Sequence, residues 1–297
     1  MKRVSFSLLA TAALALLLGC RTEKPAPAIP FPGVRVFDAT IHSAILGADM
    51  PMRIVLPKSV PADTKLPVVY MLHGYAANYT SFSAWSATDR LLTPRGFVLV
   101  MPADPSGFFL NQEDPKLRYE DYFLNEVIPA VTKLVPQAAN DPAHRAIVGM
   151  SRGGYGAVSI ALRHPEMFAF AGGLNSALDI STRPFIWHEF HESLLTNKAM
   201  GRPGSALRAK YNPFNLLNTI TPAQAPFIYL AWADDDDDSD DDRQFAAQLE
   251  ARGFRHSFAQ VKGGHTWEAT SAMMPTLGDA LTQQLKPAKQ QPEPAKQ

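Results

Sequence analysis

Ser151 lies in a short glycine-containing segment whose residue types could carry out nucleophilic chemistry. The segment GMSRG at 149–153 fits the pattern G-x-S-x-G, with an apolar stretch before it and the small-residue stretch YGAVSIALRHP at 155–165 after it. At a sharp strand-to-helix turn of this kind the serine hydroxyl is exposed, and larger side chains two positions on either side would collide. The stretch therefore predicts a serine nucleophile between a buried strand and a helix.

A serine hydroxyl needs a base that accepts its proton, and His265 is the histidine best placed to act as one. It follows the apolar stretch HSFAQV at 256–261, and Gly263 and Gly264 before it permit a sharp exit from a strand. His256 begins that stretch and would lie at the wrong end of the strand. We expect the other six histidines to be surface or structural residues: His42, His73, His144, His164, His188 and His191.

The stretch MLHGY at 71–75 ends another apolar segment and could supply a hydrogen-bond donor. Acyl transfer passes through a tetrahedral intermediate whose oxyanion is stabilised by two preorganised N–H groups. We expect one to be the backbone amide of Arg152, directly after the serine. The other is expected from the backbone of Tyr75, with Gly74 as the alternative.

Elements that could position these residues alternate along the chain. Strands are expected at Val34–Ile41, Met52–Leu56, 68–72, 97–101, 145–150, 168–174, 227–232 and 256–261. Helix-like segments lie between them, for example Tyr119–Val135 and Gln244–Arg252. The alternation predicts an α/β fold with a mostly parallel sheet and helices on both faces. In such a sheet, ligands bind beyond the carboxyl ends of the strands.

Composition excludes several classes of protein. The 297 residues include 28 Lys+Arg and 28 Asp+Glu, and 46% are hydrophobic, so a sizeable core is expected. A neutral chain without a basic stripe offers no electrostatic case for nucleic acid. The single cysteine permits no internal disulfide, and no zinc-type Cys/His spacing occurs.

The amino terminus has the pattern of an export signal. A basic start at residues 1–3 precedes an uncharged, mostly apolar run at 4–18, too short to cross a bilayer comfortably. The run ends LLGC, which resembles the lipobox of bacterial lipoproteins, so lipidation of Cys20 is expected. Arg21 follows, and by the sorting rule of Gram-negative lipoproteins it implies the outer membrane. An ordinary signal with a chance cysteine is the alternative.

The chain divides into four expected parts. Residues 1–20 form the signal with its lipobox, and 21–32 form a proline-rich tether that favours extended backbone. Residues 33–285 form the folded domain. Residues 286–297 are polar and proline-rich and are expected to form a disordered tail.

Several motifs together resemble the esterase branch of the α/β-hydrolases. These are LHGY at 72–75, RYEDYFLNEVIPAV at 118–131, the elbow block at 149–179, YNPFNLL at 211–217 and GGHTWE at 263–268. The branch includes S-formylglutathione hydrolases, feruloyl and acetylxylan esterases, siderophore esterases and mycolyltransferases. The resemblance covers most of 34–285. It implies an α/β-hydrolase with a Ser–acid–His triad and no metal or organic cofactor.

The resemblance places the acid after the strand at 227–232, usually as Gly-x-x-Asp. Here eight aspartates occupy the nine positions 234–242, and Ala233 replaces the glycine. Asp236 takes the acid's position, and Asp234 or Asp235 is the alternative if the register shifts. The acid would hold His265 in the right tautomer.

The remaining aspartates have simpler interpretations. We expect Asp237 and Asp238 to be solvated, and Asp240, Asp241 and Asp242 to cap the start of a helix. A calcium loop of the EF-hand type is excluded, because there is no mid-loop glycine and position twelve is Phe245. A calcium site of another kind stays an alternative.

The leading hypothesis is a secreted, lipid-anchored serine carboxylesterase that acts on a small-molecule or carbohydrate ester. Phe108, Phe109 and Trp187 are candidates to line the substrate pocket, with core packing as the alternative for each. A cell-envelope acyltransferase is a second hypothesis, since a sugar or lipid hydroxyl could replace water. A non-catalytic binding lipoprotein on a hydrolase scaffold is a third.

Overall fold

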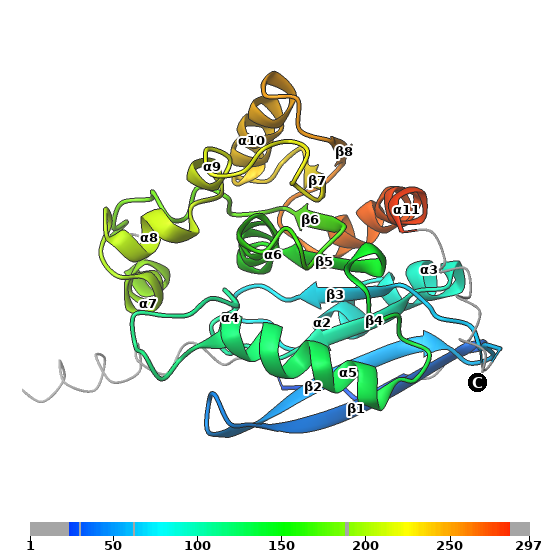
Figure 1. Cartoon of the computed structure of the whole chain (residues 1–297). Helices are drawn as coiled ribbons and strands as arrows, with labels where there is room; N and C mark the ends of the chain where they lie inside the picture. Colours follow the sequence, from blue (N-terminus) through cyan, green and yellow to red (C-terminus); the bar gives the residue numbers. More distant parts are fainter. Residues whose placement is uncertain (1–23, 30, 62, 188–189, 286–297) are drawn as a thin grey trace, which may run out of the picture.

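Within the residues that this computed structural model describes, namely 24–29, 31–61, 63–187 and 190–285, eight strands form one sheet (Figure 1). The strands are β1 Val34–Ser43, β2 Ala48–Pro57, β3 Val68–Leu72, β4 Val98–Pro102, β5 Arg145–Met150, β6 Phe170–Leu174, β7 Phe227–Ala233 and β8 His256–Val261. Their order is β1-β2-β4-β3-β5-β6-β7-β8. β1 pairs with β2 and β2 with β4 in antiparallel fashion, and every other neighbouring pair is parallel.

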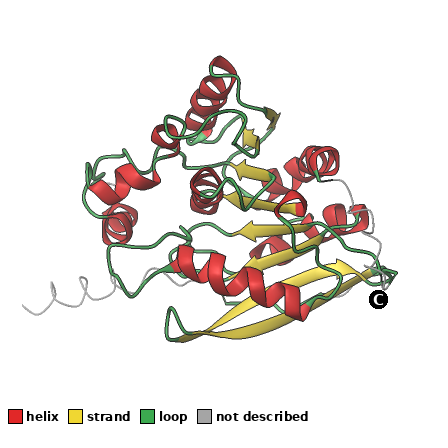
Figure 2. Cartoon of the chain, viewed as in Figure 1, coloured by secondary structure: helices red, strands yellow, loops and turns green. Residues whose placement is uncertain are grey.

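Helices cover both faces of the sheet (Figure 2). They are α2 Ser81–Trp85, α3 Thr88–Leu92, α4 Tyr119–Tyr122, α5 Ile128–Leu134, α6 Arg152–Arg163, α7 Phe190–Met200, α8 Ala206–Tyr211, α9 Pro213–Leu216, α10 Ser239–Ala251 and α11 Trp267–Gln284. Short turns of other helical types lie at η1 Thr93–Arg95, η2 Phe123–Val127 and η3 Pro142–His144. The predicted α/β-hydrolase fold is confirmed.

The side chains of β3 show how apolar cores form on both faces of the sheet. Val68, Tyr70 and Leu72 enter one core with residues of α5 and α6, whereas Val69 and Met71 enter the other with residues of α3 and α11. Successive side chains of a strand point to opposite faces, so a strand covered on both faces reads as a continuous apolar run. This is why the central strands could be located closely from the sequence.

The carboxyl ends of the parallel strands meet at one edge of the sheet, and α7 and α8 lie beyond that edge (Figure 1). The loop after β3 carries Tyr75, the turn after β5 carries Ser151, and the loops after β7 and β8 carry Asp236 and His265. Residues from distant parts of the sequence therefore gather at this edge, as expected for a parallel sheet.

The amino-terminal predictions lie mostly outside the described residues. The signal, Cys20 and the tail at 286–297 are among the residues whose structure is not described. Within the expected tether, Ala26 donates its N–H to Thr80 and accepts a hydrogen bond from Arg53, so the tether is not free over its whole length. Among the described residues, no helix is long and apolar enough to cross a membrane.

Candidate active site

Ser151 sits at a strained turn between β5 and α6. Its φ of 56° and ψ of −122° place a non-glycine residue in a backbone region that L-residues rarely adopt. Its backbone N–H donates to the carbonyl of Leu174 at 3.0 Å, which ties the turn to the end of β6. Backbone strain of this kind persists where the surrounding structure enforces it and is concentrated at functional sites.

The glycines around Ser151 are required by the close approach of backbone. A Cβ on Gly149 would lie 2.1 Å from the carbonyl oxygen of Gly153. A Cβ on Gly153 would in turn lie 2.1 Å from the carbonyl oxygen of Leu72. Both distances are far below contact, so this turn can form only with glycine at these two positions.

His265 and Asp236 are joined by a hydrogen bond. His265 Nδ1 lies 2.9 Å from Asp236 Oδ2, and the Asp236 side chain is only 1% exposed. The other carboxylate oxygen of Asp236 accepts the backbone N–H of Asp238 at 2.9 Å. The carboxylate is therefore held on both sides, and an imidazole with its proton on Nδ1 presents Nε2 as the free base.

The structure places the alternative acids elsewhere. Asp234 pairs with Lys262 at 2.5 Å and accepts the backbone N–H of Gly263 at 3.1 Å. Asp235 is exposed and contacts the His265 loop through its backbone, which donates to the carbonyl of Gly263 at 2.8 Å. Of the three candidate aspartates, only Asp236 places its carboxylate against His265.

The environment of His265 favours its cation. Burial by itself would lower the pKa of His265, but the hydrogen bond and charge of Asp236 and the nearby charge of Asp238 raise it above its ordinary value of 6.5. A base that gains a proton during the reaction is stabilised by these carboxylates. The side chain of His265 is 38% exposed, so it also faces the open cleft.

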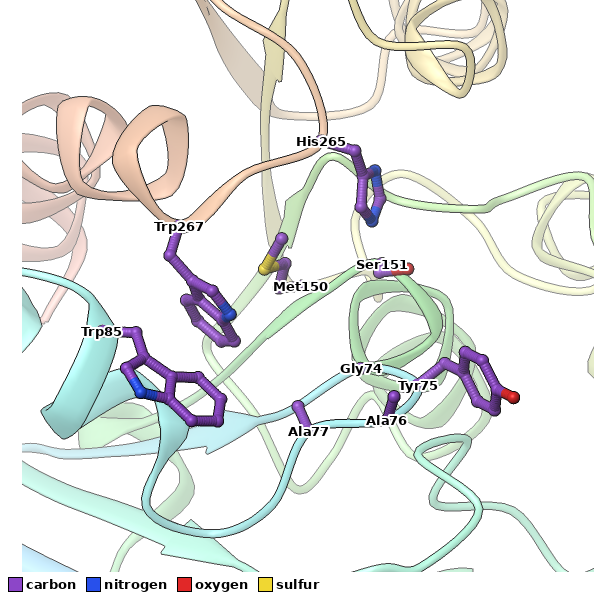
Figure 3. Close-up of a pocket in the computed structure, with 9 residues that line it drawn as sticks. All are labelled: Gly74, Tyr75, Ala76, Ala77, Trp85, Met150, Ser151, His265 and Trp267. Atoms are coloured by element: carbon purple, nitrogen blue, oxygen red, sulfur yellow. The ribbon is translucent and has the colours of Figure 1, made fainter. Parts of the chain in front are cut away.

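Ser151 and His265 line the same cleft at the sheet edge. In Figure 3 the imidazole lies above Ser151, while the indoles of Trp85 and Trp267 stand across Met150 from the serine. The expected nucleophile, base and acid are thus brought to one place by three different loops.

The expected oxyanion donors lie beside the serine. Gly74 packs so closely that a Cβ there would lie 3.0 Å from the Cβ of Ser151, and Tyr75 follows it in the wall of the cleft. Arg152 is the first residue of α6, and the first N–H groups of a helix have no partner within the helix. Both predicted amides are therefore close to the Ser151 turn.

A buried network supports the loop that carries Tyr75. His73 accepts the backbone N–H of Asp104 at Nε2, 3.3 Å away, and its Nδ1 lies 3.0 Å from the carbonyl oxygen of Gly74. Burial lowers the pKa of His73 to about 4, so the ring is neutral. Asp104 in turn accepts the backbone N–H groups of Ser106 and Phe109. The loops after β3 and β4 therefore form one packed unit behind the cleft.

Comparisons with known proteins identify the family of this chain. The family model described as "Putative esterase" matches residues 43–280. The chain belongs to this esterase family. It is 25% identical over 231 residues to the acetyl esterase of Caldicellulosiruptor saccharolyticus, and the match spans 76% of this chain and 86% of that protein. The esterase is therefore an enzyme that acts on ester bonds.

Solved structures of the same fold include two with nearly complete overlap. FphF, a fluorophosphonate-binding serine hydrolase of Staphylococcus aureus, has a TM-score of 0.73 at 20% identity, covering 85% of this chain and 99% of that one. A ferulic acid esterase has a TM-score of 0.72 at 22% identity, covering 85% of this chain and 98% of that one. Both confirm the α/β-hydrolase fold of the esterase.

The cleft of the esterase has two compartments that share Tyr75, Ser151 and His265. An aromatic compartment of about 200 Å³ is lined by these three residues and by Gly74, Ala76, Ala77, Trp85, Met150 and Trp267. An acidic compartment of about 390 Å³ is lined by the same three and by Ala177, Arg183, Glu192, Asp235, Asp236, Asp237 and Asp238.

The predicted substrate-pocket residues are not in this cleft. Phe109 is fully buried and packs edge-on against His73, so it belongs to the core. Phe108 is fully buried and lines a neighbouring pocket of about 180 Å³, which shares Tyr75 with the cleft. Trp187 is 79% exposed and stacks with Phe190, and it lines neither compartment. Apolar type alone could not distinguish core positions from cleft positions.

Three predictions about the aspartate run are wrong. Asp238 is not solvated, because it accepts a hydrogen bond from Arg183 at 2.5 Å and its side chain is only 16% exposed. Asp241 also pairs with Arg183, at 2.8 Å, instead of capping the helix. Asp242 is fully buried and accepts the backbone N–H of Ser176 at 2.9 Å. Asp240, Asp241 and Asp242 do lie in the first turn of α10, but Asp240 pairs with Arg243 of the same helix, and the other two contact residues of other loops.

Two functional contacts were missed from the sequence. Asn175, with φ of 44°, uses its side chain to join the loops after β7 and β8. The buried guanidinium of Arg152 lies over the ring of Tyr75 at 4.3 Å and donates to Glu192 of α7 at 2.9 Å. Asn175 follows the strand stretch FAFAGGL directly, which was the only available signal for it.

The other histidines have local partners. His42 pairs with Asp49, His144 with Asp141, His164 with Glu120 and His256 with Glu250. His191 contacts the hydroxyl of Tyr75 at 3.1 Å. His188 lies outside the described residues.

Within the described part of the chain, Asp236, Asp238 and His265 form a group that could hold a metal ion, since their ligand atoms lie within 4.8 Å of one another. However, Asp236 already binds Nδ1 of His265, and Asp238 binds Arg183. A metal ion would have to displace both contacts.

Proposed function

We propose that this chain is a serine carboxylesterase in which Ser151, His265 and Asp236 form a catalytic triad and the reaction proceeds through an acyl-enzyme. The observation that carries the proposal is the 2.9 Å hydrogen bond between His265 Nδ1 and Asp236 Oδ2 in the cleft that also contains Ser151. The hydrogen bond leaves Nε2 of the imidazole for the serine proton.

In the first half of the reaction, Nε2 of His265 takes the proton of the Ser151 hydroxyl as Oγ attacks the ester carbonyl carbon. The carbonyl oxygen becomes an oxyanion and accepts hydrogen bonds from the backbone N–H groups of Tyr75 and Arg152. The C–O bond to the alcohol then breaks, and the imidazolium gives its proton to the departing alcohol. In the second half, water repeats these steps and releases the carboxylic acid.

We propose further that the enzyme is exported and held at the outer membrane by a lipid on Cys20. The LLGC pattern supports this placement, and Arg21 after the cysteine supports the outer membrane over the inner one. The substrate would then be a small-molecule or carbohydrate ester that reaches the cell envelope. An acetyl or aryl acyl group would suit the small aromatic compartment.

The mechanism is tested by active-site labelling together with turnover. Purified enzyme is treated with a fluorophosphonate probe and assayed on nitrophenyl acetate, nitrophenyl butyrate and methyl ferulate. We expect labelling and turnover in the wild type and loss of both in Ser151→Ala. A variant that keeps wild-type turnover would contradict the proposal. A wild type that binds the esters without turnover would indicate a binding lipoprotein instead, and ester products formed with added alcohols would indicate an acyltransferase.

A further inference from the structure

Part of the aspartate run is paired with cations of the same chain. Asp234 pairs with Lys262 at 2.5 Å, and Asp240 pairs with Arg243 at 2.7 Å. Asp238 and Asp241 both accept hydrogen bonds from the guanidinium of Arg183. In the part of the chain that the structure describes, four of the eight aspartates therefore have a lysine or arginine partner.

Asp235 and Asp237 differ from their neighbours. Both are exposed, and among the described residues neither forms an ion pair. Both line the acidic compartment, one on either side of Asp236 in the sequence. Both carboxylates are thus exposed, without a cationic partner in the described part of the chain, in the wall of the cleft, within the compartment that also contains Ser151.

The other charged residues of this compartment do not offset them. Arg183 also pairs with Asp179, at 2.5 Å, so three carboxylates surround its single positive charge. Glu192 is itself bound to Arg152. The compartment therefore keeps a net negative charge beside the nucleophile, whereas the compartment with Trp85 is lined by no carboxylate among the described residues.

We propose that the acidic compartment binds the alcohol part of the substrate and selects alcohols that carry a positive charge, an ammonium or quaternary amine a few bonds from the ester oxygen. The inference rests on the proposed function, because Ser151 must be the nucleophile for the compartment to receive the leaving group. The aromatic compartment receives the acyl part. The cleft is a ligand site because it contains the nucleophile, and its unbalanced carboxylates determine which ligand it favours.

The physical reason is the field of two uncompensated carboxylates in a partly enclosed cleft. Opposite charges a few ångströms apart attract more strongly beside low-dielectric protein than in bulk water. A cleft lined by one sign of charge also concentrates ligands of the opposite sign. Esters whose alcohol carries a carboxylate or phosphate should be repelled for the same reason.

The test uses two acetate esters of almost identical shape. Acetylcholine carries a quaternary nitrogen where 3,3-dimethylbutyl acetate carries a carbon atom, so the pair differs chiefly in charge. We expect kcat/KM for acetylcholine to exceed that for the neutral ester by about tenfold at low ionic strength. The preference should shrink in about 0.5 M NaCl, where screening acts over only a few ångströms.

Variants assign the preference to the two carboxylates. In the double variant Asp235→Asn/Asp237→Asn, the ratio of the two kcat/KM values should fall to about one. The control is Asp240→Asn, which also removes an acidic charge from the run but at an exposed position, paired with Arg243, outside the cleft. It should keep the wild-type ratio.

The outcomes separate this inference from the proposed function. Equal kcat/KM for both esters in a wild type that hydrolyses nitrophenyl acetate overturns the charge selection and leaves the triad intact. A double variant that keeps the preference, or an Asp240→Asn variant that loses it equally, also overturns the inference. Failure to hydrolyse nitrophenyl acetate, with no fluorophosphonate labelling, overturns the proposed function itself.

Discussion

Asn175 Oδ1 accepts the backbone N–H of Ala233 at 2.8 Å, just ahead of the aspartate run in the chain. The side-chain amide of Asn175 also donates to the carbonyl of Gly264, 3.4 Å away and next to His265. One fully buried side chain thus connects the loop that carries Asp236 with the loop that carries His265.

Asn175→Ala should therefore misplace the acid and the base relative to each other. Leaving the buried N–H of Ala233 unpaired costs about 1–3 kcal/mol of folding stability. We expect kcat to fall about tenfold or more, since small displacements of catalytic groups are costly, with less change in KM. Asn218→Ala, at an exposed asparagine bound to Arg252, is the control and should keep wild-type kcat. Equal kcat in the two variants would contradict the positioning role.

The aspartates of the run should be unequal in catalysis. Asp236→Asn should lower kcat by about 10⁴-fold, because an amide favours the wrong tautomer of His265. Asp234→Asn should stay within a few-fold of wild type, because its pairing with Lys262 is on the surface. The measurement is kcat on nitrophenyl acetate at neutral pH for each single variant. A steep loss at Asp234 with none at Asp236 would show that the acid is assigned wrongly.

The pH dependence of kcat/KM should reflect the raised pKa of His265. The imidazole must be neutral to accept the serine proton, so kcat/KM should fall as the pH decreases through that pKa, which lies above the ordinary 6.5. Asp238→Asn removes a negative charge 3.9 Å from His265 Nδ1 and should therefore shift the acidic limb to lower pH. Asp240→Asn is the matched control and should leave the limb in place. If the acidic limb of kcat/KM stayed at the same pH in Asp238→Asn, the charge of Asp238 would not contribute to the pKa of His265.

A side chain at Gly107 should displace the backbone that carries the predicted oxyanion donor of Tyr75. A Cβ at this position would lie 2.7 Å from the carbonyl oxygen of Gly74 and 3.1 Å from the backbone nitrogen of Tyr75. Gly107→Ala should displace that backbone and lower kcat by roughly 10- to 100-fold, somewhat less than the loss of a whole donor. Gly96→Ala is the control, because Gly96 also has a positive φ but nothing within 4 Å of an added Cβ. Both variants should lose stability through backbone strain, and only Gly107→Ala should lose turnover.

The membrane anchor can be tested without the enzyme's activity. Cys20→Ser should move the protein from the detergent phase to the aqueous phase when whole cells are partitioned in Triton X-114. The reason is that a lipid chain contributes about 0.8 kcal/mol per buried methylene to membrane binding. Wild-type protein in the aqueous phase would contradict the lipoprotein proposal and leave the catalytic proposal unaffected.

The local sequence pattern was sufficient to predict the strands and the turn at Ser151, because both depend on residues close together in the chain. The stretches at 68–72, 145–150 and 256–261 match strands with the same bounds. The first two lie inside the sheet, where strands buried on both faces are largely apolar, whereas 256–261 forms the edge strand β8 with partly exposed side chains. The turn at Ser151 could be predicted because its glycines are required by contacts within and beside the turn itself. Parallel topology then places the ends of these strands together, so candidate catalytic residues could be named without a structure.

The tertiary structure alone decided which residue contacts which across the sheet edge. Eight aspartates in nine positions look alike in sequence, and their differences come largely from Lys262, Arg183, Ser176 and His265, which contact them from other loops. Phe108 and Phe109 likewise belong to the core. Packing behind the cleft determines their burial, and this cannot be told from residue type. Charge partners and burial depend on contacts between residues far apart in the chain. These contacts could not be predicted from the local pattern of the sequence.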